Sequence, residues 1–123
     1  MGAAPLRIMI VEDEIFIALG LEMELKVAGY TVCAVVSTGE EAIAAAARES
    51  PDVILMDIRL AGEIDGIEAA QQIQAAKSTP VIFMTGYSDA DVMTRAKGLQ
   101  PLGYLIKPVR LHDLKPLFAA AFP

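Results

Sequence analysis

Three carboxylates, a hydroxyl and an amine stand at the ends of four short apolar runs, and together they suit the binding of a cation and a phosphoryl group. The residues are Glu12, Asp13, Asp57, Thr85 and Lys107. Carboxylates that share a partly dehydrated site repel one another strongly unless a cation lies between them. The Thr85 hydroxyl and the Lys107 ammonium group can both donate to phosphoryl oxygens. If the fold gathers these residues, we expect one site for a divalent cation and a phosphoryl group.

The expected ligands are all oxygen atoms, which favours Mg²⁺, or Mn²⁺ in its place, over zinc. The chain has one cysteine, Cys33, and one histidine, His112, and they are far apart in the sequence. Mg²⁺ typically binds one or two carboxylates, keeps several water molecules and bridges to a phosphoryl group. A carboxylate beside it can accept that group as an aspartyl phosphate. Asp57 is the best candidate, because it alone follows a middle strand as a single acid.

The elements that must position these residues alternate between short apolar runs and helical stretches, which is typical of parallel strands joined by crossover helices. In such sheets ligands bind beyond the carboxyl ends of the strands, where each of the polar residues is expected. The expected strands are 7–11, 31–36, 52–56, 81–84 and 103–106. The expected helices are 15–28, a second after Ser37 that ends near 49, 65–77, a fourth capped by Ser88 or Asp89 that ends at 98, and a last one from 111.

Capping residues and prolines mark the expected helix boundaries. Gly29 should end the first helix, since glycine is common just past a helix end. Ser37-Thr-Gly-Glu40 has the form of a capping box, and Asp65-Gly-Ile-Glu68 should open the third helix. Pro116 should disturb the last helix past its first turn, because proline lacks a backbone donor and clashes with the preceding turn.

The chain resembles the receiver domain of bacterial two-component response regulators over essentially its whole length. The match consists of Glu12-Asp13, Asp57, Thr85, Tyr104 and Lys107-Pro108, in the family's order and spacing. The resemblance implies an α/β, flavodoxin-like, doubly wound sheet of five parallel strands in the order 2-1-3-4-5 with five helices. It also implies one chemotaxis-receiver-like domain over residues 1–123.

By the same resemblance, Asp57 is the phosphoacceptor of a phosphorelay. Asp13, Asp57 and the backbone carbonyl of Arg59 would bind Mg²⁺, and Glu12 would act largely through water. Lys107 would pair first with Asp57 and then with the phosphoryl group. Such a domain catalyses its own phosphorylation and dephosphorylation, so it is a signalling switch and not a turnover enzyme on an external substrate.

The resemblance also implies how the signal leaves the site. Thr85 would swing toward the phosphoryl group and Tyr104 would turn inward with it, which would change the surface of the fourth helix, fifth strand and fifth helix. Tyr104 could instead be an ordinary core residue, since large aromatic side chains bury readily. The Lys107-Pro108 peptide bond is expected to be cis, as is usual in the family and accessible to an X-Pro bond.

The sequence departs from the family pattern at two places. Ala61 stands where the family usually has proline, and Gly66 follows Asp57 by nine residues where the family glycine follows by eight. The loop after Asp57 therefore carries one extra residue. The run 83–87, Phe-Met-Thr-Gly-Tyr, resembles a subgroup with Phe-x-Thr-Gly at the end of the fourth strand, often found beside non-standard sensor histidine kinases.

Composition agrees with one compact domain. The chain has 123 residues, 54% of them hydrophobic, which is enough for a full core. A net charge of −6 and a pI near 4.6 argue against direct nucleic-acid binding. No apolar run approaches the roughly 20 residues of a membrane span. A lone cysteine and a start that lacks the features of a signal peptide suit the cytoplasm.

Two other functions fit parts of the pattern. A phosphatase of the haloacid dehalogenase type also forms an aspartyl phosphate, but it places a second acid two residues after the nucleophile, where this chain has Arg59. A flavodoxin-like FMN binder shares the expected fold. Its first loop should be rich in Ser, Thr and Gly, whereas Glu12-Asp13-Glu14 would repel phosphate in the absence of a metal. We therefore favour the phosphoacceptor switch.

The first helix has apolar residues on two sides. At about 100° per residue, Ile17, Leu21, Leu25 and Ala28 form one stripe, which should pack on the sheet. Phe16, Leu19 and Met23, with Val27 at the margin, lie nearly opposite. A contiguous exposed apolar patch usually marks an interaction site. We expect Phe16, Leu19 and Met23 to be exposed and to bind the kinase, since this helix commonly does so in receiver domains.

The expected partners are a sensor histidine kinase or a histidine phosphotransfer protein. The output is left open: it could be a covalently linked or a separate output domain, and the face of the fourth helix, fifth strand and fifth helix could form a homodimer. Direct contact with nucleic acid or a membrane is not expected.

Overall fold

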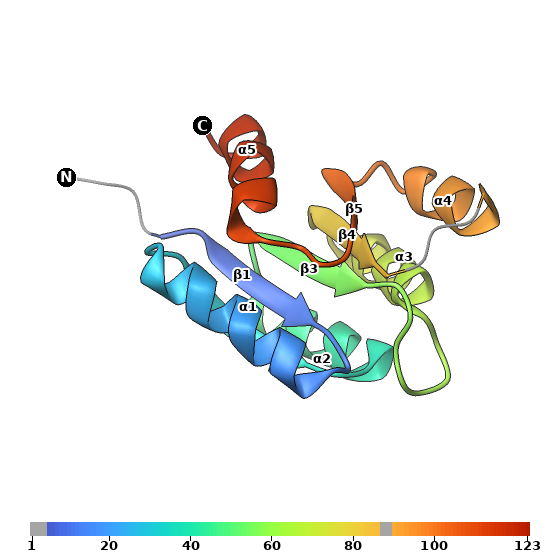
Figure 1. Ribbon diagram of the computed structural model, residues 1–123. Helices are drawn as coiled ribbons and strands as arrows, with labels where there is room; N and C mark the ends of the chain where they lie inside the picture. The colour runs from blue at the N-terminus through green and yellow to red at the C-terminus, as the bar shows by residue number, and fades with distance from the viewer. Residues whose placement is uncertain (1–4, 87–89) are drawn as a thin grey trace.

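A computed structural model describes residues 5–86 and 90–123 and shows five strands alternating with five helices (Figure 1). The elements are β1 (Arg7–Val11), α1 (Ile15–Val27), β2 (Thr31–Val36), α2 (Gly39–Glu49), β3 (Val53–Asp57), α3 (Gly66–Ala76), β4 (Val81–Thr85), α4 (Ala90–Lys97), β5 (Gly103–Ile106) and α5 (Leu111–Ala121). Within the described residues, no helix is both long and apolar enough to cross a membrane.

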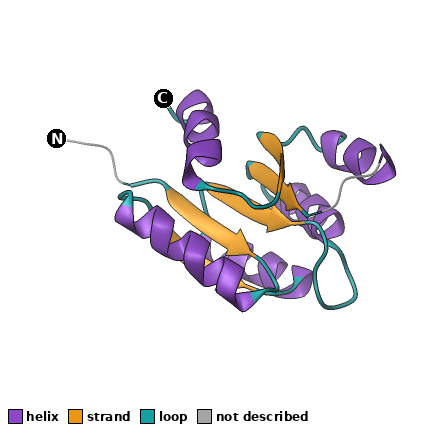
Figure 2. Cartoon of the chain, in the orientation of Figure 1, coloured by secondary structure: helices purple, strands orange, loops and turns teal. Residues whose placement is uncertain are grey.

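All of the strand pairs are parallel, and the strand order is β2-β1-β3-β4-β5. This confirms the predicted fold class and topology. Helices cover both faces of the sheet (Figure 2). Residues of α1 and α5 form one core with one face, and residues of α2, α3 and α4 form a second core with the other. The middle strands β3 and β4 are buried along their whole length, as expected for strands covered on both faces.

The strands β3 and β4 each extend one residue beyond the predicted end, so Asp57 and Thr85 are the last residues of their strands. The backbone ladder continues past them. The Ile58 amide donates to the Met84 carbonyl at 3.1 Å, and the Lys107 amide donates to the Thr85 carbonyl at 2.7 Å. The two side chains are therefore fixed by a paired backbone and do not lie on free loops.

The start of α3 agrees with the sequence, and the start of α2 differs from it. At the predicted start of α3, the Asp65 side chain accepts from the Glu68 amide at 2.8 Å and the Glu68 side chain accepts from the Asp65 amide at 3.3 Å, which forms a capping box. The start of α2 is one residue later than predicted, because Thr38 and not Ser37 accepts from a backbone amide, that of Glu41. The proposed cap of α4 at Ser88 or Asp89 lies outside the described residues.

The prediction that Pro116 disturbs the last helix is wrong, because α5 continues to Ala121. Burial of Leu114 and Phe118, which lie one turn apart on the same side of the helix, stabilises α5 on either side of the proline. The Phe118 ring also meets Tyr30 edge-on, with ring centroids 5.2 Å apart. Tertiary packing thus outweighs the local cost of the proline, about 3 kcal/mol.

The buried stripe of α1 is also shifted from the prediction. It consists of Ala18, Leu21 and Leu25, whereas Ile17 and Ala28 are exposed. The sequence gives little contrast here, because the helix is apolar on almost every side. Gly29 follows the helix end with a φ of +97°, which confirms its expected role.

The edge strand β2 carries a bulge. Ile8 pairs with Val32 and Met9 pairs with Ala34, so Cys33 is left without a partner residue on β1. The Cys33 side chain is half-buried, and burial raises the pKa of its thiol.

Candidate functional site

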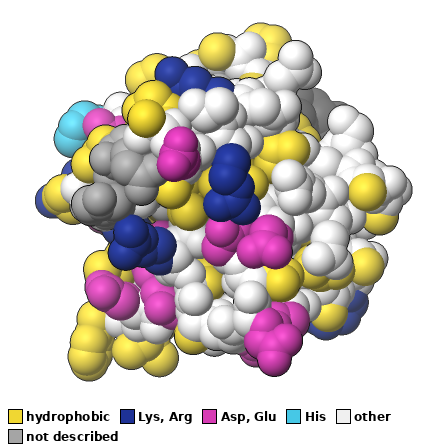
Figure 3. Space-filling view, turned by 90° about the vertical axis from the view of Figure 1, so that its right-hand side faces the viewer, with side chains coloured by type: hydrophobic (Ala, Val, Ile, Leu, Met, Phe, Trp, Pro, Cys, Tyr) yellow, Lys and Arg dark blue, Asp and Glu magenta, His cyan; other side chains and the backbone are white. Residues whose placement is uncertain are grey.

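The sheet register brings the predicted polar residues to one edge of the sheet. Val11 pairs with Met56, Asp57 with Met84, and Thr85 with Ile106, so the strands end side by side. The residues that follow them therefore share one surface, which carries acidic and basic side chains close together (Figure 3).

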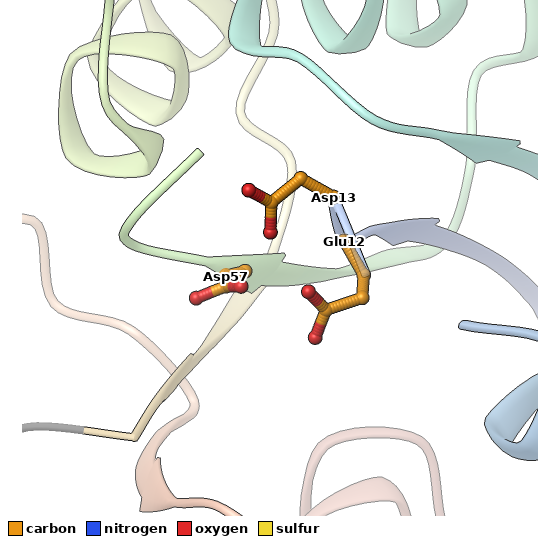
Figure 4. A group of neighbouring side chains, drawn as sticks. All are labelled: Glu12, Asp13 and Asp57. Carbon is orange, nitrogen blue, oxygen red and sulfur yellow. The ribbon is translucent and has the colours of Figure 1, made fainter. Parts of the chain in front are cut away.

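Three carboxylates gather at this edge. Glu12 and Asp13 follow β1, Asp57 ends β3, and one oxygen atom of each lies within 4.8 Å of the others. Figure 4 shows the side chains reaching toward a common space from neighbouring strand ends. Asp13 is exposed, whereas Glu12 and Asp57 are only 2% and 3% exposed. The cluster is thus open to solvent on the Asp13 side and buried on the other.

Lys107 binds both buried carboxylates. Its Nζ lies 2.7 Å from Asp57 Oδ2 and 2.5 Å from Glu12 Oε1. The pairing with Asp57 was predicted, but direct contact with Glu12 was not. The second Glu12 oxygen accepts from the Glu14 amide at 3.1 Å, which fixes the carboxylate against its own loop. The only sequence signal for this contact is that an acidic residue, Glu12, and a basic residue, Lys107, each follow a strand at the same edge of the sheet.

Burial and charge set the protonation of the cluster. Burial is the largest influence on Asp57, and together with the neighbouring Glu12 it outweighs Lys107 and raises the pKa of Asp57 from its usual 3.8 to about 7. Burial also opposes ionisation of Glu12, but hydrogen bonds from Lys107, Asp57 and the Glu14 amide prevail and lower its pKa. The two carboxylates raise the pKa of Lys107 against the effect of burial. In the absence of a cation, Asp57 thus holds a proton below about pH 7.

This donor set fits a hard divalent cation. When all three carboxylates are ionised, Lys107 offsets only one of their charges, which leaves two negative charges to be balanced. The ligands are oxygen atoms, as Mg²⁺ and Mn²⁺ prefer. A groove of about 400 Å³ gives the cation access; it is lined by Asp13, Glu14, Asp57, Arg59, Gly86 and Lys107. Glu12, Asp13 and Asp57 are thus a group that could hold such an ion.

The loop after Asp57 depends on Gly66. The Gly66 amide donates to the Ile58 carbonyl at 2.8 Å and closes the loop. A Cβ atom at Gly66 would lie 2.1 Å from the Asp57 carbonyl oxygen, so no other residue fits here without a shift of the backbone. In the sequence, Gly66 has an unusual spacing from Asp57, but that spacing did not predict this close approach. The structure shows that it allows the first turn of α3 to approach the end of β3.

Thr85 and Tyr104 lie where a signal could leave the site. Thr85 is 1% exposed at the end of β4. Tyr104 pairs with Phe83 across the β4–β5 ladder and packs against the core that includes α4. Its hydroxyl is buried without a hydrogen-bond partner among the described residues. The structure therefore shows a packing role for the Tyr104 ring, and the switch role stays a prediction. The Lys107–Pro108 bond is cis, as predicted.

The predicted partner surface on α1 is exposed. Phe16, Leu19 and Met23 are 86%, 44% and 67% exposed, which confirms that part of the prediction. A mostly apolar groove of about 440 Å³ runs from Phe16 of α1 to Glu12 and Lys107. A protein bound at Phe16 would therefore lie beside these two residues.

Comparisons with known proteins agree with this geometry. The family described as the response regulator receiver domain matches residues 8–119. The transcriptional regulatory protein PdtaR of Mycobacterium tuberculosis is 34% identical over 120 residues, which cover 98% of this chain and 58% of that protein. The regulatory protein AtoC of Escherichia coli is 37% identical over 88% of this chain and 23% of its own length. The chain thus spans 58% of the length of PdtaR and 23% of the length of AtoC.

Solved structures show the same fold. The receiver domain of a modulated diguanylate cyclase from Desulfovibrio desulfuricans has a TM-score of 0.89 and 38% identity over 95% of this chain and 93% of that one. A CheY-like receiver domain protein from Methanospirillum hungatei has a TM-score of 0.87 and 25% identity, with the same coverage.

Proposed function

Because the chain belongs to the response regulator receiver domain family, a family of signalling switches, we propose that Asp57 is its phosphoacceptor. One observation supports this assignment above the others. Asp57 is the carboxylate that Lys107 contacts at 2.7 Å and that also faces the open groove beside Asp13. Glu12 does not line this groove, and Asp13 has no ion pair with Lys107 among the described contacts. We extend the proposal to residues 1–123 as one receiver domain.

We propose that Asp13, Asp57 and the Arg59 carbonyl hold Mg²⁺, or Mn²⁺, with Glu12 acting through water. When bound, the cation neutralises charge on the phosphoryl oxygens and on the attacking carboxylate. A carboxylate oxygen of Asp57 attacks the phosphorus of a phosphohistidine; the P–O bond forms as the P–N bond breaks, and the imidazole leaves with the electron pair. The same residues would support hydrolysis of the acyl phosphate, so phosphorylation and dephosphorylation are both the domain's own reactions.

Lys107 has two tasks in this scheme. Before the reaction it holds the Asp57 carboxylate in place and favours its ionised form. After the reaction its ammonium group is close enough to donate to the phosphoryl oxygens. Glu12 keeps Lys107 charged and directed toward the site, because the pair lies in a buried setting where an unpaired charge is costly.

The switch that follows phosphorylation is proposed to run through Thr85 and Tyr104. The Thr85 hydroxyl would donate to a phosphoryl oxygen, and Tyr104 would turn with it on the neighbouring strand. The β5 end of this path reaches the surface at Ile106, which is 52% exposed. We propose the α4–β5–α5 face as the output surface, where a linked or separate output domain or a second copy of the chain would bind.

The phosphoryl donor is proposed to be a sensor histidine kinase or a histidine phosphotransfer protein in the cytoplasm, bound on Phe16, Leu19 and Met23. Its helical bundle would cover the apolar side of α1 and bring its histidine to the groove beside Asp57. The name of PdtaR states regulation of transcription for that protein. We propose that such an effect would come to this chain only through an output partner, since no direct nucleic-acid contact is proposed.

Labelling with acetyl phosphate tests the function directly. The parent protein should take up one phosphoryl group in Mg²⁺, detected by mass, and EDTA should prevent it. Asp57→Asn should take up none, whereas Asp91→Asn, which removes an exposed acid of α4, should behave as the parent. Equal labelling of Asp57→Asn and the parent, or labelling that EDTA does not affect, would contradict the assignment.

A further inference from the structure

The loop between β3 and α3 is attached to the start of α2, and the attachment begins two residues after Arg59, whose carbonyl is a proposed cation ligand. The loop comprises residues 58–65 and includes the extra residue that distinguishes this chain from the family pattern. We propose that Glu40, on the first turn of α2, is a positioning residue that holds this loop so that the Arg59 carbonyl faces Asp13 and Asp57. This inference rests on the proposed Mg²⁺ site.

Glu40 contacts the loop at two consecutive residues. Its Oε2 accepts from the Glu63 amide at 3.3 Å. Gly62 has a φ of +98°, and a Cβ atom added there would lie 2.9 Å from Glu40 Oε1. The carboxylate therefore lies directly against the loop backbone, and Gly62 allows that approach because it has no side chain and tolerates positive φ.

Two neighbouring contacts attach the same part of the loop to the same part of α2. Thr38, the N-cap of α2, forms a parallel bridge with Ala61. Gly39 lies against Ile64, so that a Cβ atom at Gly39 would come within 2.6 Å of the Ile64 side chain. The loop is thus held at residues 61, 63 and 64, and the first of these is two residues from Arg59.

This attachment reduces the conformational freedom that cation binding would otherwise have to remove. A loop of eight residues that is closed only by the Gly66–Ile58 hydrogen bond would sample many positions of the Arg59 carbonyl. Fixing the loop beforehand strengthens binding by lowering the ordering cost. Loss of the Glu40 contact should therefore weaken Mg²⁺ binding without removing any ligand.

Two variants separate the hydrogen bond from the charge. Glu40→Ala removes both, whereas Glu40→Gln keeps an acceptor oxygen for the Glu63 amide and loses the charge. Mg²⁺ is titrated into each metal-free protein and the dissociation constant is read from backbone amide NMR shifts. We expect Glu40→Ala to bind Mg²⁺ about 2- to 10-fold more weakly, which is the range for loss of one hydrogen bond, and Glu40→Gln to bind within about twofold of the parent.

Hydrogen exchange of the Glu63 amide gives a readout that needs no metal. Exchange should be faster in Glu40→Ala than in the parent and close to the parent rate in Glu40→Gln. Parent-like exchange or parent-like Mg²⁺ affinity in Glu40→Ala would overturn the inference, and so would equal weakening by both variants, since that would assign the effect to charge alone.

Asp13→Asn separates this inference from the proposed site. If the site is correct, Asp13→Asn weakens Mg²⁺ binding far more than Glu40→Ala. If Asp13→Asn binds as the parent does, the proposed cation site is wrong and the positioning role of Glu40 is overturned with it.

Discussion

Lys107 and Glu12 form a buried ion pair, with Nζ and Oε1 2.5 Å apart and the Glu12 side chain fully buried. Glu12 therefore does more than add charge to a cation site. It shares one ammonium group with Asp57, so the protonation of each carboxylate depends on the other. The first two predictions follow from this relationship.

Replacing Glu12 with Gln should lower the pKa of Asp57. Burial contributes most to the raised value of about 7, but the negative Glu12 beside Asp57 raises it further, and Gln removes that charge while leaving Lys107 to serve Asp57 alone. The titration of Asp57 can be followed by carboxyl ¹³C NMR in metal-free protein. Glu63→Gln, an exposed acid in the loop, is the control and should leave the midpoint unchanged. An Asp57 midpoint that rises in Glu12→Gln would contradict the geometry.

The stability of the metal-free protein should fall between about pH 4 and pH 7 because of Asp57. Its pKa is 3.8 in the unfolded chain and about 7 in the folded protein, so in this window the folded state binds a proton that the unfolded state has released. Stability then decreases as pH rises, by about 4 kcal/mol in total. The lowered pKa of Glu12 has the opposite effect, because ionised Glu12 stabilises the folded protein. That contribution is lost only at lower pH, as the pH falls through the folded-state pKa of Glu12.

Urea unfolding at several pH values in EDTA measures this effect. Asp57→Asn should show a flatter profile across the window and should be more stable than the parent at pH 8. Added Mg²⁺ should restore parent stability at pH 8 more than at pH 5, because the cation competes with the proton. Parallel profiles for Asp57→Asn and the parent would show that Asp57 is not the titrating group.

Replacing Gly66 with Ala should destabilise the protein by about 2–4 kcal/mol, because the new Cβ atom would lie 2.1 Å from the Asp57 carbonyl and the backbone must shift. Gly20→Ala is the matched control. Gly20 lies inside α1 with nothing within 4 Å of an added Cβ atom, so alanine there should stabilise the protein by about 0.5–1 kcal/mol. Thermal unfolding of both variants checks the pair, and similar losses of stability would contradict the close approach at Gly66.

Replacing Phe16 with Asp should slow phosphotransfer from the cognate kinase by about 10-fold or more, since a central aromatic side chain often contributes over 1.4 kcal/mol to binding. Labelling of Asp57 by acetyl phosphate should be unchanged. Phe16 is 86% exposed, so the change should not disturb the core. Equal loss in both assays would mean that the fold or the site was damaged.

Replacing Thr85 with Ala should leave phosphorylation of Asp57 in place but weaken the response to it. Coupling between two sites is typically about 1–3 kcal/mol, so the parent should shift its conformational equilibrium by roughly 5- to 150-fold. NMR shifts around Tyr104 on binding of a beryllofluoride salt report the response. Shifts as large in Thr85→Ala as in the parent would argue against this route.

The sequence was sufficient to place Glu12, Asp13, Asp57 and Lys107 at one edge of the sheet. Each follows a short apolar run, and in a parallel sheet such positions meet for topological reasons that do not depend on side-chain detail. The Glu12–Lys107 ion pair could not be predicted in the same way. It depends on which rotamer a buried glutamate adopts, and the spacing of residues carries no information on that choice.

The errors have a similar physical origin. In α1 the sequence could not distinguish Ile17 from Ala18 as the buried position, because both sides of the helix are apolar and the periodicity gives little contrast. At Pro116 the prediction considered only the local cost of a proline in a helix. It did not include the stabilisation from burying the nearby Leu114 and Phe118 side chains. Contacts across the fold decide both cases.

The bulge at Cys33 has a consequence for how the molecule behaves at high concentration. The outer side of β2 presents unpaired backbone groups, and a regular edge of this kind can act as a template for strands from other chains. Ile8 and Met9 pair with Val32 and Ala34, so the spacing along β2 is interrupted in its first half. An incoming strand cannot keep a regular hydrogen-bond ladder past this point. We therefore expect the irregular register of β2 to disfavour pairing of this sheet edge with strands of other chains.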